Sequence, residues 1–376
     1  MRKLTKRKRI LRTFQHQQVD KLVFSPRLYY WYGANGLMGR PNTDEGCSSC
    51  IPKMFLKRSE GQILDYFDAS PRYVQESYFL PLICPIWDFK DKISVWYESE
   101  KSTGQSIFYF RTPKGVLRQV SSNGHLQEYP IKTLEDMEIM KYILNHTRVI
   151  FLYPTYLIAR AMVGDRGVLA TYFFRSPYMK LIVDFMGFTN TIVFLKRYPR
   201  EMAEFMQFLE QWDDHMYENL AKSPLKILNF GENIDANLSP PPYFEKYLIP
   251  YYEKRVKEMH RYGKICTIHM DGSLKDLLPY LESLPFDGLE ALTAKPQGDV
   301  TLEEIKKAIG DKIYLDGIPS VLFLPQYSLS DIKKYTKKVL EMFSPNLILG
   351  ISDEMPPNGD IRKVAVIARM LQEFEP

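Results

Sequence analysis

Acidic residues and one histidine recur directly after short apolar runs in the second half of the chain. One run ends in His269-Met270-Asp271, and a later one is followed by Asp353. Alternate side chains of an extended strand lie on the same face, so His269 and Asp271 can bind one ion. Carboxylates gathered closely repel one another unless a cation or a basic substrate shares their site. We therefore expect a divalent metal held by His269, Asp271 and Asp353, with Glu290 or Glu232 completing the shell.

Each of these residues also has an ordinary structural interpretation. An Asp that follows a strand is commonly the N-cap of the next helix, and this suits both Asp271 and Asp353. His269 is equally compatible with a hydrogen-bonded core position. Capping does not explain Glu232 or Glu290, so the group as a whole favours a functional site.

The elements that position these residues form a repeated alternation of strands and helices. Repeated βα units indicate a parallel sheet. No glycine-rich phosphate-binding pattern follows a strand, which favours an α/β (β/α)8 barrel over a doubly wound dinucleotide-binding sheet. Functional residues of such barrels lie at the carboxyl ends of the strands, where five successive ends carry an acid. The expected strands are 168–173, 227–230, 264–269, 288–291, 312–316 and 347–351, and the expected helices are 178–186, 200–221, 243–262, 274–283, 302–309, 331–343 and 361–374.

The first 148 residues lack this alternation. Residues 3–15 have the spacing of a short amphipathic helix, and residues 92–120 read as antiparallel strands with turns at 102–104 and 113–115. Residues 25–52 are rich in Tyr, Gly and Pro and predict a long functional loop. We expect one domain over 1–376, in which 1–148 form a helical and β-hairpin extension covering the barrel mouth and 149–376 form the main run of βα units.

Composition sets limits on the class of protein. Apolar residues make up 45% and charged residues 25% of the 376, which excludes intrinsic disorder. Aromatic residues make up 14%, which suggests an aromatic-lined pocket, formed by Tyr29, Tyr30, Trp31 and Tyr32, although packing of this loop on the barrel rim explains them equally well.

The net charge of +5 comes from the first twelve residues. They carry seven basic residues and no acid, so the remaining chain has a net charge of −2. A nucleic-acid partner bound through this segment would show a steep salt dependence, but no base-reading motif accompanies it. We interpret the segment as a solvated helix or a docking surface, and the barrel as slightly acidic.

Four cysteines are too few for a disulfide scaffold in a chain of this length. Cys47 and Cys50 have the spacing of half a zinc site, but no second pair lies nearby, so we interpret them as loop cysteines. The basic start is not followed by an apolar signal region, and no apolar run approaches the roughly 18 residues of a membrane span. These features predict a soluble cytoplasmic protein.

Several segments, in order, resemble the uroporphyrinogen decarboxylase superfamily, whose fold is a (β/α)8 barrel. The basic start with Val19-Asp20-Lys21 resembles the first helix and turn of the family, and Thr112-Pro-Lys-Gly115 resembles an element of its less characterised branches. The remaining matches are Phe230-Gly-Glu-Asn233, Ser239-Pro240, Pro250-Tyr-Tyr252, His269-Met-Asp-Gly272 with Leu277-Leu278, and Gly350-Ile-Ser-Asp-Glu-Met-Pro-Pro357.

The resemblance implies one of two chemistries. Uroporphyrinogen decarboxylases hold a polycarboxylate on an arginine-rich loop, whereas the matching stretch of this chain has Arg27 alone among aromatic residues. A carboxylate-lined mouth would also repel an anionic tetrapyrrole. The chain is therefore more similar to the branch that moves methyl groups to or from a corrinoid, using zinc held by a His-x-Cys pair and a later Cys.

The chain departs from that branch in its ligands, because Asp271 and Asp353 stand where the family has cysteines. Such a site suits Mn, Fe or Mg as well as zinc, and an oxygen substrate on which the metal acts as a Lewis acid. We expect a methyltransferase that demethylates a small compound, such as an aryl methyl ether, and passes the methyl group to a Co(I) corrinoid on a partner protein. A homodimer is left open. The expected catalytic residues are Glu232, His269 and Asp353, and the expected substrate-binding residues are Tyr29, Trp31, Asn233 and Asp316.

Two alternatives remain at this point. The first is cofactor-free decarboxylation of a tetrapyrrole, as in the other branch of the family. The second is a non-catalytic barrel, or nucleic-acid binding through the basic N-terminal helix.

Overall fold

A computed structural model describes residues 3–35, 51–73, 78, 80–87, 93–100, 104–122 and 125–376. The chain divides into two compact units. Unit 1 comprises Met1–Leu82, Tyr153–Phe173 and Pro224–Pro376, and unit 2 comprises Ile83–Leu152 and Phe174–Ser223. The expected single domain, and an extension that covers the barrel mouth, stay predictions.

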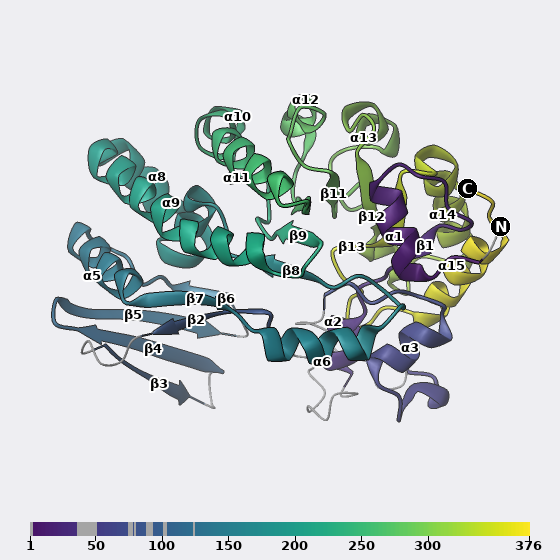
Figure 1. The fold of residues 1–376 in the computed structure, drawn as a ribbon, viewed down its shortest axis with the longest axis horizontal. Helices are drawn as coiled ribbons and strands as arrows, with labels where there is room; N and C mark the ends of the chain where they lie inside the picture. The colour runs from purple at the N-terminus through teal and green to yellow at the C-terminus, as the bar shows by residue number, and fades with distance from the viewer. Residues whose placement is uncertain are drawn as a thin grey trace. The chain divides into compact units, whose positions relative to one another are not determined.

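Unit 1 is an α/β fold around a seven-stranded parallel sheet (Figure 1). Its strands run in the order β1-β13-β12-β11-β10-β9-β8, so neighbours in sequence are mostly neighbours in the sheet. The alternation of short apolar runs and helices in the second half of the chain correctly predicted this parallel sheet. The strands are β1 (Val23–Phe24), β8 (Ala170–Phe173), β9 (Ile227–Phe230), β10 (Ile265–His269), β11 (Gly288–Glu290), β12 (Ile313–Pro319) and β13 (Leu347–Ser352).

An extended segment at residues 70–73 connects the two edges of this sheet. The Ser70 N–H donates to the carbonyl oxygen of Phe24 in β1 at 2.7 Å. Tyr73 forms a parallel bridge with Ala170 of β8. One segment thus pairs with both edge strands of a curled sheet, which is consistent with a barrel-like fold.

Helices pack along the outside of the sheet. In Figure 1, α11 to α15 lie along the outside of β9 to β13. Ile10 and Phe14 of α1 pack with Val23, Ile227 and other strand residues in one buried cluster, which confirms the amphipathic helix predicted at the start of the chain. The helices of unit 1 are α1 (Lys6–Phe14), α2 (Tyr29–Ala34), α3 (Glu60–Tyr66), α6 (Tyr153–Val163), α10 (Pro241–Tyr243), α11 (Ile249–Arg261), α12 (Leu278–Leu281), α13 (Leu302–Ala308), α14 (Leu329–Phe343) and α15 (Ile361–Glu373).

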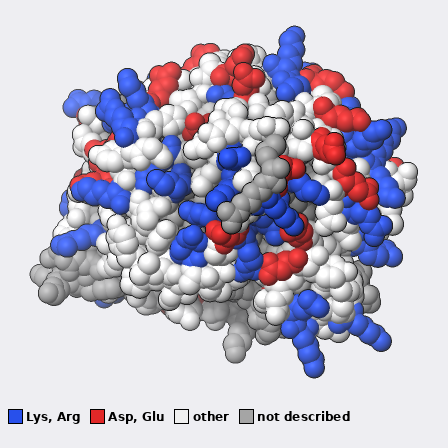
Figure 2. All heavy atoms as spheres, turned by 45° about the vertical axis from the view of Figure 1, so that its right-hand side comes forward, with Lys and Arg blue, Asp and Glu red and all other residues white. Residues whose placement is uncertain are grey.

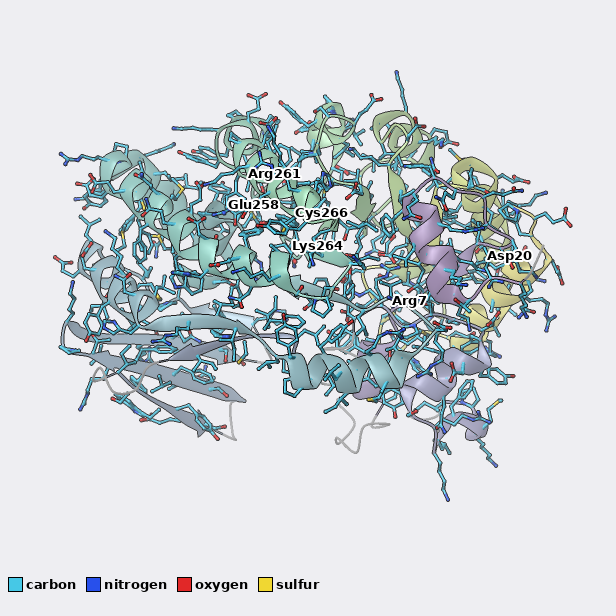
Figure 3. All side chains as sticks on the ribbon, in the orientation of Figure 1. Arg7, Asp20, Glu258, Arg261, Lys264 and Cys266 are labelled. Atoms are coloured by element: carbon cyan, nitrogen blue, oxygen red, sulfur yellow. The ribbon has the colours of Figure 1, made fainter. Side chains whose placement is uncertain are left out.

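The basic residues of α1 are partly neutralised within unit 1. The Arg9 guanidinium donates to both carboxylate oxygens of Asp20 at 2.7 and 2.9 Å, and Figure 3 shows Asp20 close to α1. Lys6 forms an ion pair with Asp68 at 2.6 Å. On the face drawn in Figure 2, basic and acidic side chains are interspersed. A concentration of Lys and Arg on one face would be the mark of a nucleic-acid-binding surface.

Unit 2 contains a four-stranded antiparallel sheet, a two-stranded antiparallel sheet and helices. The antiparallel strands and the turn predicted at 113–115 are confirmed by the pairing of Thr112 with Gly115. The turn predicted at 102–104 lies mostly outside the described residues. The strands are β2 (Ile83–Trp87), β3 (Ser94–Glu100), β4 (Gln105–Thr112), β5 (Gly115–Ser122), β6 (His125–Glu128) and β7 (Thr147–Phe151), and the helices are α5 (Leu134–Asn145), α7 (Pro177–Lys180), α8 (Phe188–Arg197) and α9 (Pro199–Lys222).

Several helix predictions were wrong in detail. The helix expected over 243–262 is α10, a π-helical segment at Phe244–Leu248 and then α11, and the one expected over 178–186 is α7 followed by a π-helical segment at Leu181–Phe185. The loop expected over 25–52 contains α2, while its residues 36–50, with Cys47 and Cys50, lie outside the described part. Within the described residues, no helix is long and apolar enough to cross a membrane.

Candidate functional site

The candidate site lies at the carboxyl end of the unit 1 sheet. His269 is the last residue of β10 and is the Cα partner of Glu290, the last residue of β11. Asp271 follows β10 two residues later, and Asp353 follows β13 directly. Neighbouring parallel strands end at the same edge of the sheet, which is why residues far apart in the sequence meet there.

The backbone at these strand ends is unusual. Asn233, Ala291, Asp316 and Asp353 all have positive φ angles, between 56° and 84°. Such conformations are uncommon for residues other than glycine and cluster at functional sites, where packing maintains them. The strand ends therefore have a backbone conformation of the kind that is enriched at functional sites.

Three ligand atoms converge on one point, and these belong to His269, Asp271 and Asp353. The Nε2 atom of His269 lies 3.7 Å from Oδ2 of Asp271 and 3.7 Å from Oδ1 of Asp353. Zinc binds N and O ligands at roughly 2.0–2.2 Å in a tetrahedron, which separates its ligands by about 3.4 Å. The observed spacing fits one divalent cation bound by these three residues.

Glu290 lies at the other nitrogen of the imidazole. Its Oε2 is 3.5 Å from Nδ1 of His269, and its side chain is fully buried. Three groups hold this carboxylate: the Tyr73 hydroxyl donates to it at 2.8 Å, Arg72 donates at 2.8 Å, and the Asn229 amide donates as well. Glu290 thus faces Nδ1 and leaves Nε2 to Asp271 and Asp353.

The charges of this group are strongly coupled. Burial by itself would lower the pKa of His269, but hydrogen bonding to Asp271 and Glu290 raises that pKa to about 10. Burial opposes the ionised form of Glu290, yet His269 and Arg72 hold the pKa of Glu290 well below its usual range. With no cation bound, the imidazolium supplies the positive charge that the carboxylates require.

Two arginines also pair with acids of the site. Arg72 is 2.8 Å from Oδ1 of Asp316, whose pKa is raised to about 7, mainly by burial. Gly350 makes this approach possible, because a Cβ there would collide with the Asp316 carboxylate. Arg27 contacts Asp353 at 3.2 Å and Glu354 at 2.8 Å.

Arg72 and Tyr73 were missed from the sequence. They lie on the extended segment that connects β8 to β1, which has no recognisable periodicity. Asn229, by contrast, left a signal, since it is a polar residue inside the predicted strand 227–230 and proves fully buried. A buried polar residue in a strand needs a hydrogen-bond partner, and this one bonds Thr267 and Glu290.

An aromatic surface stands beside His269, formed by residues that the sequence analysis did not name. The rings of Tyr73 and Tyr172 stack at 4.0 Å, and Tyr172 meets the His269 ring edge-on at 6.4 Å. The Arg27 guanidinium lies over both tyrosine rings at 5.6 and 5.5 Å. Trp31, predicted to bind substrate, is completely buried in α2, as a packing residue would be.

The remaining residues that were predicted to be catalytic or to bind substrate lie at several different places in unit 1. Glu232, two residues after the end of β9, is fully buried and is not among the three ligand residues that converge. Asn233 is exposed at the same strand end, and Asp316 is buried against Arg72. Tyr29 is half-buried at the first position of α2. The substrate and catalytic roles of these residues stay predictions.

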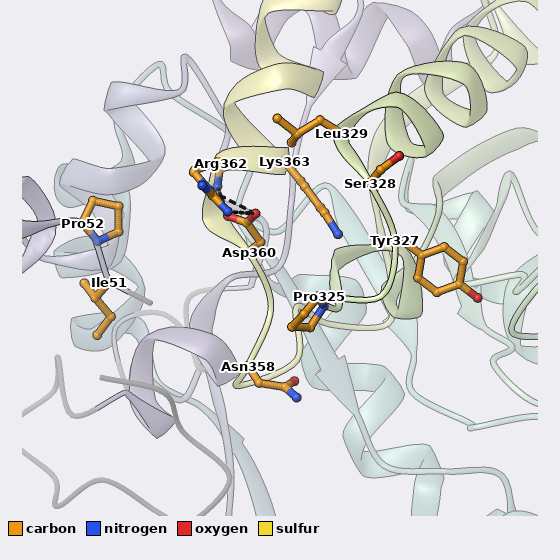
Figure 4. A pocket seen from close by; sticks show the side chains of 10 residues that line it. All are labelled: Ile51, Pro52, Pro325, Tyr327, Ser328, Leu329, Asn358, Asp360, Arg362 and Lys363. Carbon is orange, nitrogen blue, oxygen red and sulfur yellow. Dashed lines mark hydrogen bonds and ion pairs between the residues drawn. The ribbon is translucent and has the colours of Figure 1, made fainter. Parts of the chain in front are cut away.

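A groove of about 620 Å³ opens near the starts of α14 and α15 (Figure 4). It is lined by residues that follow β12 and β13, including Tyr327 and Asn358, and by Ile51 and Pro52. Figure 4 shows Asp360 and Arg362 paired on its wall. His269 and the residues that contact it do not line this groove, so its volume says nothing of the chemistry at the strand ends.

Comparisons with known proteins give one family match and several similar structures. The model of the uroporphyrinogen decarboxylase (URO-D) family matches residues 120–374. A methyltransferase from Methanosarcina mazei is similar in structure, with a TM-score of 0.62, 14% identity and coverage of 99% of both chains. A B12-independent methionine synthase from Shewanella sp. W3-18-1 has a TM-score of 0.47 and 11% identity over 94% of this chain and 97% of that one. No curated protein matches the sequence significantly.

Proposed function

Because the chain belongs to the uroporphyrinogen decarboxylase family, we propose that it is a metal-dependent methyltransferase acting on a small methylated compound. The observation that carries the proposal is the convergence of His269 Nε2, Asp271 and Asp353 within ligand distance of one cation. The structural similarity to a methyltransferase supports the fold on which this chemistry would be built.

His269, Asp271 and Asp353 would hold the metal. Zinc is the first candidate, although two carboxylates and one imidazole also suit Mn, Fe or Mg. When bound, the metal supplies Lewis acidity toward an oxygen of the substrate. Glu290 keeps the imidazole oriented through Nδ1, which makes it a positioning residue in this proposal rather than the fourth ligand.

The substrate we favour is a methoxylated aromatic compound. The stacked pair of Tyr73 and Tyr172 offers an aromatic surface next to His269, and ring stacking of this kind contributes about 0.5–1.5 kcal/mol beyond burial. Asn233 presents an exposed amide at the neighbouring strand end for a hydrogen bond to the substrate. Asp316 acts indirectly by holding Arg72.

The methyl acceptor in this proposal is a reduced corrinoid on a partner protein. The C–O bond of the ether would break with its electron pair left on oxygen, and that oxygen would then take up a proton. The residues of this chain bind the substrate and orient it through stacking.

The proposal is tested with an anaerobic assay of the purified protein, a panel of aryl methyl ethers and free Co(I) cobalamin as acceptor. We expect methylcobalamin to form, and His269→Ala and Asp353→Asn to lower the rate at least about 100-fold, the scale of losing a transition-state charge contact. His215→Ala is the control, because this exposed histidine of α9 lies outside the site. No methyl transfer above the enzyme-free rate, or full activity of His269→Ala, would contradict the proposal.

A second candidate, decarboxylation of a tetrapyrrole, is favoured by the presence of Arg27 and Arg72 at the site. Both arginines are already paired with carboxylates of the chain, which leaves little net positive charge for a polycarboxylate. Turnover of uroporphyrinogen without metal or corrinoid would establish this candidate in place of the first.

A further inference from the structure

A second group of metal-ligating side chains lies at the opposite end of β10 from His269. His260 is near the end of α11, Cys266 is the second residue of β10, and Asp287 immediately precedes β11. One ligand atom from each of the three lies within 4.8 Å of the others. Cys266 and the neighbouring Lys264 are labelled in Figure 3, below Arg261 of α11.

This group faces away from the barrel interior. Thr267 and His269 point to the side where Asn229 and Glu290 lie, as their contacts show. Because side chains alternate along a strand, Cys266 points to the other side, toward the helix layer. The two ligand groups therefore occupy opposite faces and opposite ends of a single strand.

Hydrogen bonds hold Asp287 in place between Cys266 and His260 before any ion arrives. Oδ2 of Asp287 accepts a hydrogen bond from the Cys266 backbone N–H at 2.7 Å and lies 2.9 Å from Nε2 of His260. The Asp287 backbone is held on both sides, by its N–H to the Cys266 carbonyl and by its own carbonyl to Ile313. Cys266 is fully buried, whereas the His260 and Asp287 side chains are 39% and 32% exposed, so an ion reaches the group from solvent.

We propose that His260, Cys266 and Asp287 bind a thiophilic divalent cation of the zinc class, with water as the fourth ligand. Thiolate, imidazole and carboxylate are the three ligand types that zinc takes in proteins. One thiolate and one carboxylate neutralise the two charges of the ion, and a thiolate disfavours Mg²⁺ and Ca²⁺. The bound ion ties the end of α11 to β10 and β11, so its role is structural and does not depend on the proposed methyl transfer.

Cobalt(II) is the probe that distinguishes this site from the one at His269, because only a cysteine ligand gives a thiolate-to-cobalt charge-transfer band. The titration uses the full chain with Cys47→Ser and Cys50→Ser, which removes two other thiols. We expect one equivalent of cobalt to develop the band. The band should be absent after Cys266→Ser. After His260→Ala, the cobalt affinity read from the band should be at least about tenfold lower. It should persist in His269→Ala and in Cys84→Ser.

Zinc provides an independent readout that does not depend on the buried cysteine variant. An ion that binds only the folded state raises the midpoint of thermal unfolding. Zinc should raise it in the background chain and raise it less after His260→Ala, an exposed substitution that leaves the core intact. The proposal would be overturned if the background chain gave no cobalt band, or if the band survived Cys266→Ser. It would also be overturned if zinc raised the unfolding midpoint equally with and without His260.

Discussion

His269 and Glu290 face each other across two neighbouring parallel strands, with Nδ1 of the imidazole 3.5 Å from Oε2 of the carboxylate. Nε2 of the same ring faces Asp271 and Asp353. A carboxylate at the far nitrogen fixes the tautomer and the orientation of a metal-binding histidine. The two nitrogens of His269 therefore have separate tasks in the proposed site.

Replacing Glu290 by Gln tests that division. The substitution removes the negative charge at Nδ1 while keeping the size of the side chain, and we expect zinc affinity at the His269 site to fall about 10- to 100-fold. A competition titration with a chromophoric chelator, in a His260→Ala background, measures the change. Glu303→Gln on the exposed surface of α13 serves as the control. An affinity equal to that of the parent chain would show that Glu290 does not position the histidine.

Replacing Arg72 by Ala should destabilise unit 1. Glu290 and Asp316 are both fully buried, and Arg72 is 2.8 Å from an oxygen of each. Removing one partner of a buried ion pair leaves an uncompensated charge and costs about 3–5 kcal/mol. Urea unfolding measures the loss of stability. Arg72→Lys keeps the charge but cannot contact both acids, so its free energy of unfolding should lie between those of the parent chain and Arg72→Ala. A loss below about 1 kcal/mol would mean that other groups satisfy these acids.

The sequence predicted the parts of the site that follow regular patterns. His269, Asp271 and Asp353 were found because each comes at or just after the end of an apolar strand, and the parallel sheet brings such ends together. Arg72 and Tyr73 were not found, because the segment that carries them pairs by single contacts with β1 and β8 and has no period. The sequence also did not predict which acids face Nδ1 and Nε2 of His269, because spacing along the chain does not say which acid meets which ring nitrogen.

The fold was predictable to a similar degree. Strands of the second half were correctly placed to within a few residues, because buried parallel strands read as continuous apolar runs. The helices α6 and α8 were missed, since α6 keeps Tyr153, Leu157 and Ile158 exposed and so lacks the usual one-sided pattern. The π-helical turn before α11 depends on packing of Phe244 and Leu248, which no local pattern specifies.

The ion pair of Arg9 and Asp20 predicts a pH dependence of stability. Hydrogen bonding to Arg9, and to the Leu4 backbone, holds the pKa of Asp20 well below its usual range although burial opposes this. The stabilisation is therefore complete above the unfolded-state pKa of about 4 and is lost as the pH falls below it. Asp20→Asn should lower stability at pH 7 by about 1 kcal/mol, after allowance for solvent screening, and by less at pH 3.

Urea midpoints of the parent chain and of Asp20→Asn at pH 3, 5 and 7 measure this effect. Asp331→Asn, at an exposed N-terminal turn of α14, provides a comparison for the loss of one carboxylate elsewhere. A difference between the parent and Asp20→Asn that stayed constant, or grew, toward pH 3 would contradict the role of the pair.

The central claim is that His269, Asp271 and Asp353 hold a metal ion, and metal content tests it most directly. The chain carrying His260→Ala, Cys47→Ser and Cys50→Ser is purified without added metal, and its bound metals are measured by inductively coupled plasma mass spectrometry. We predict close to one equivalent of a divalent transition metal, lost on adding His269→Ala while the protein remains folded by circular dichroism. Metal-free protein that also fails to take up zinc, or a content unchanged by His269→Ala, would contradict the account.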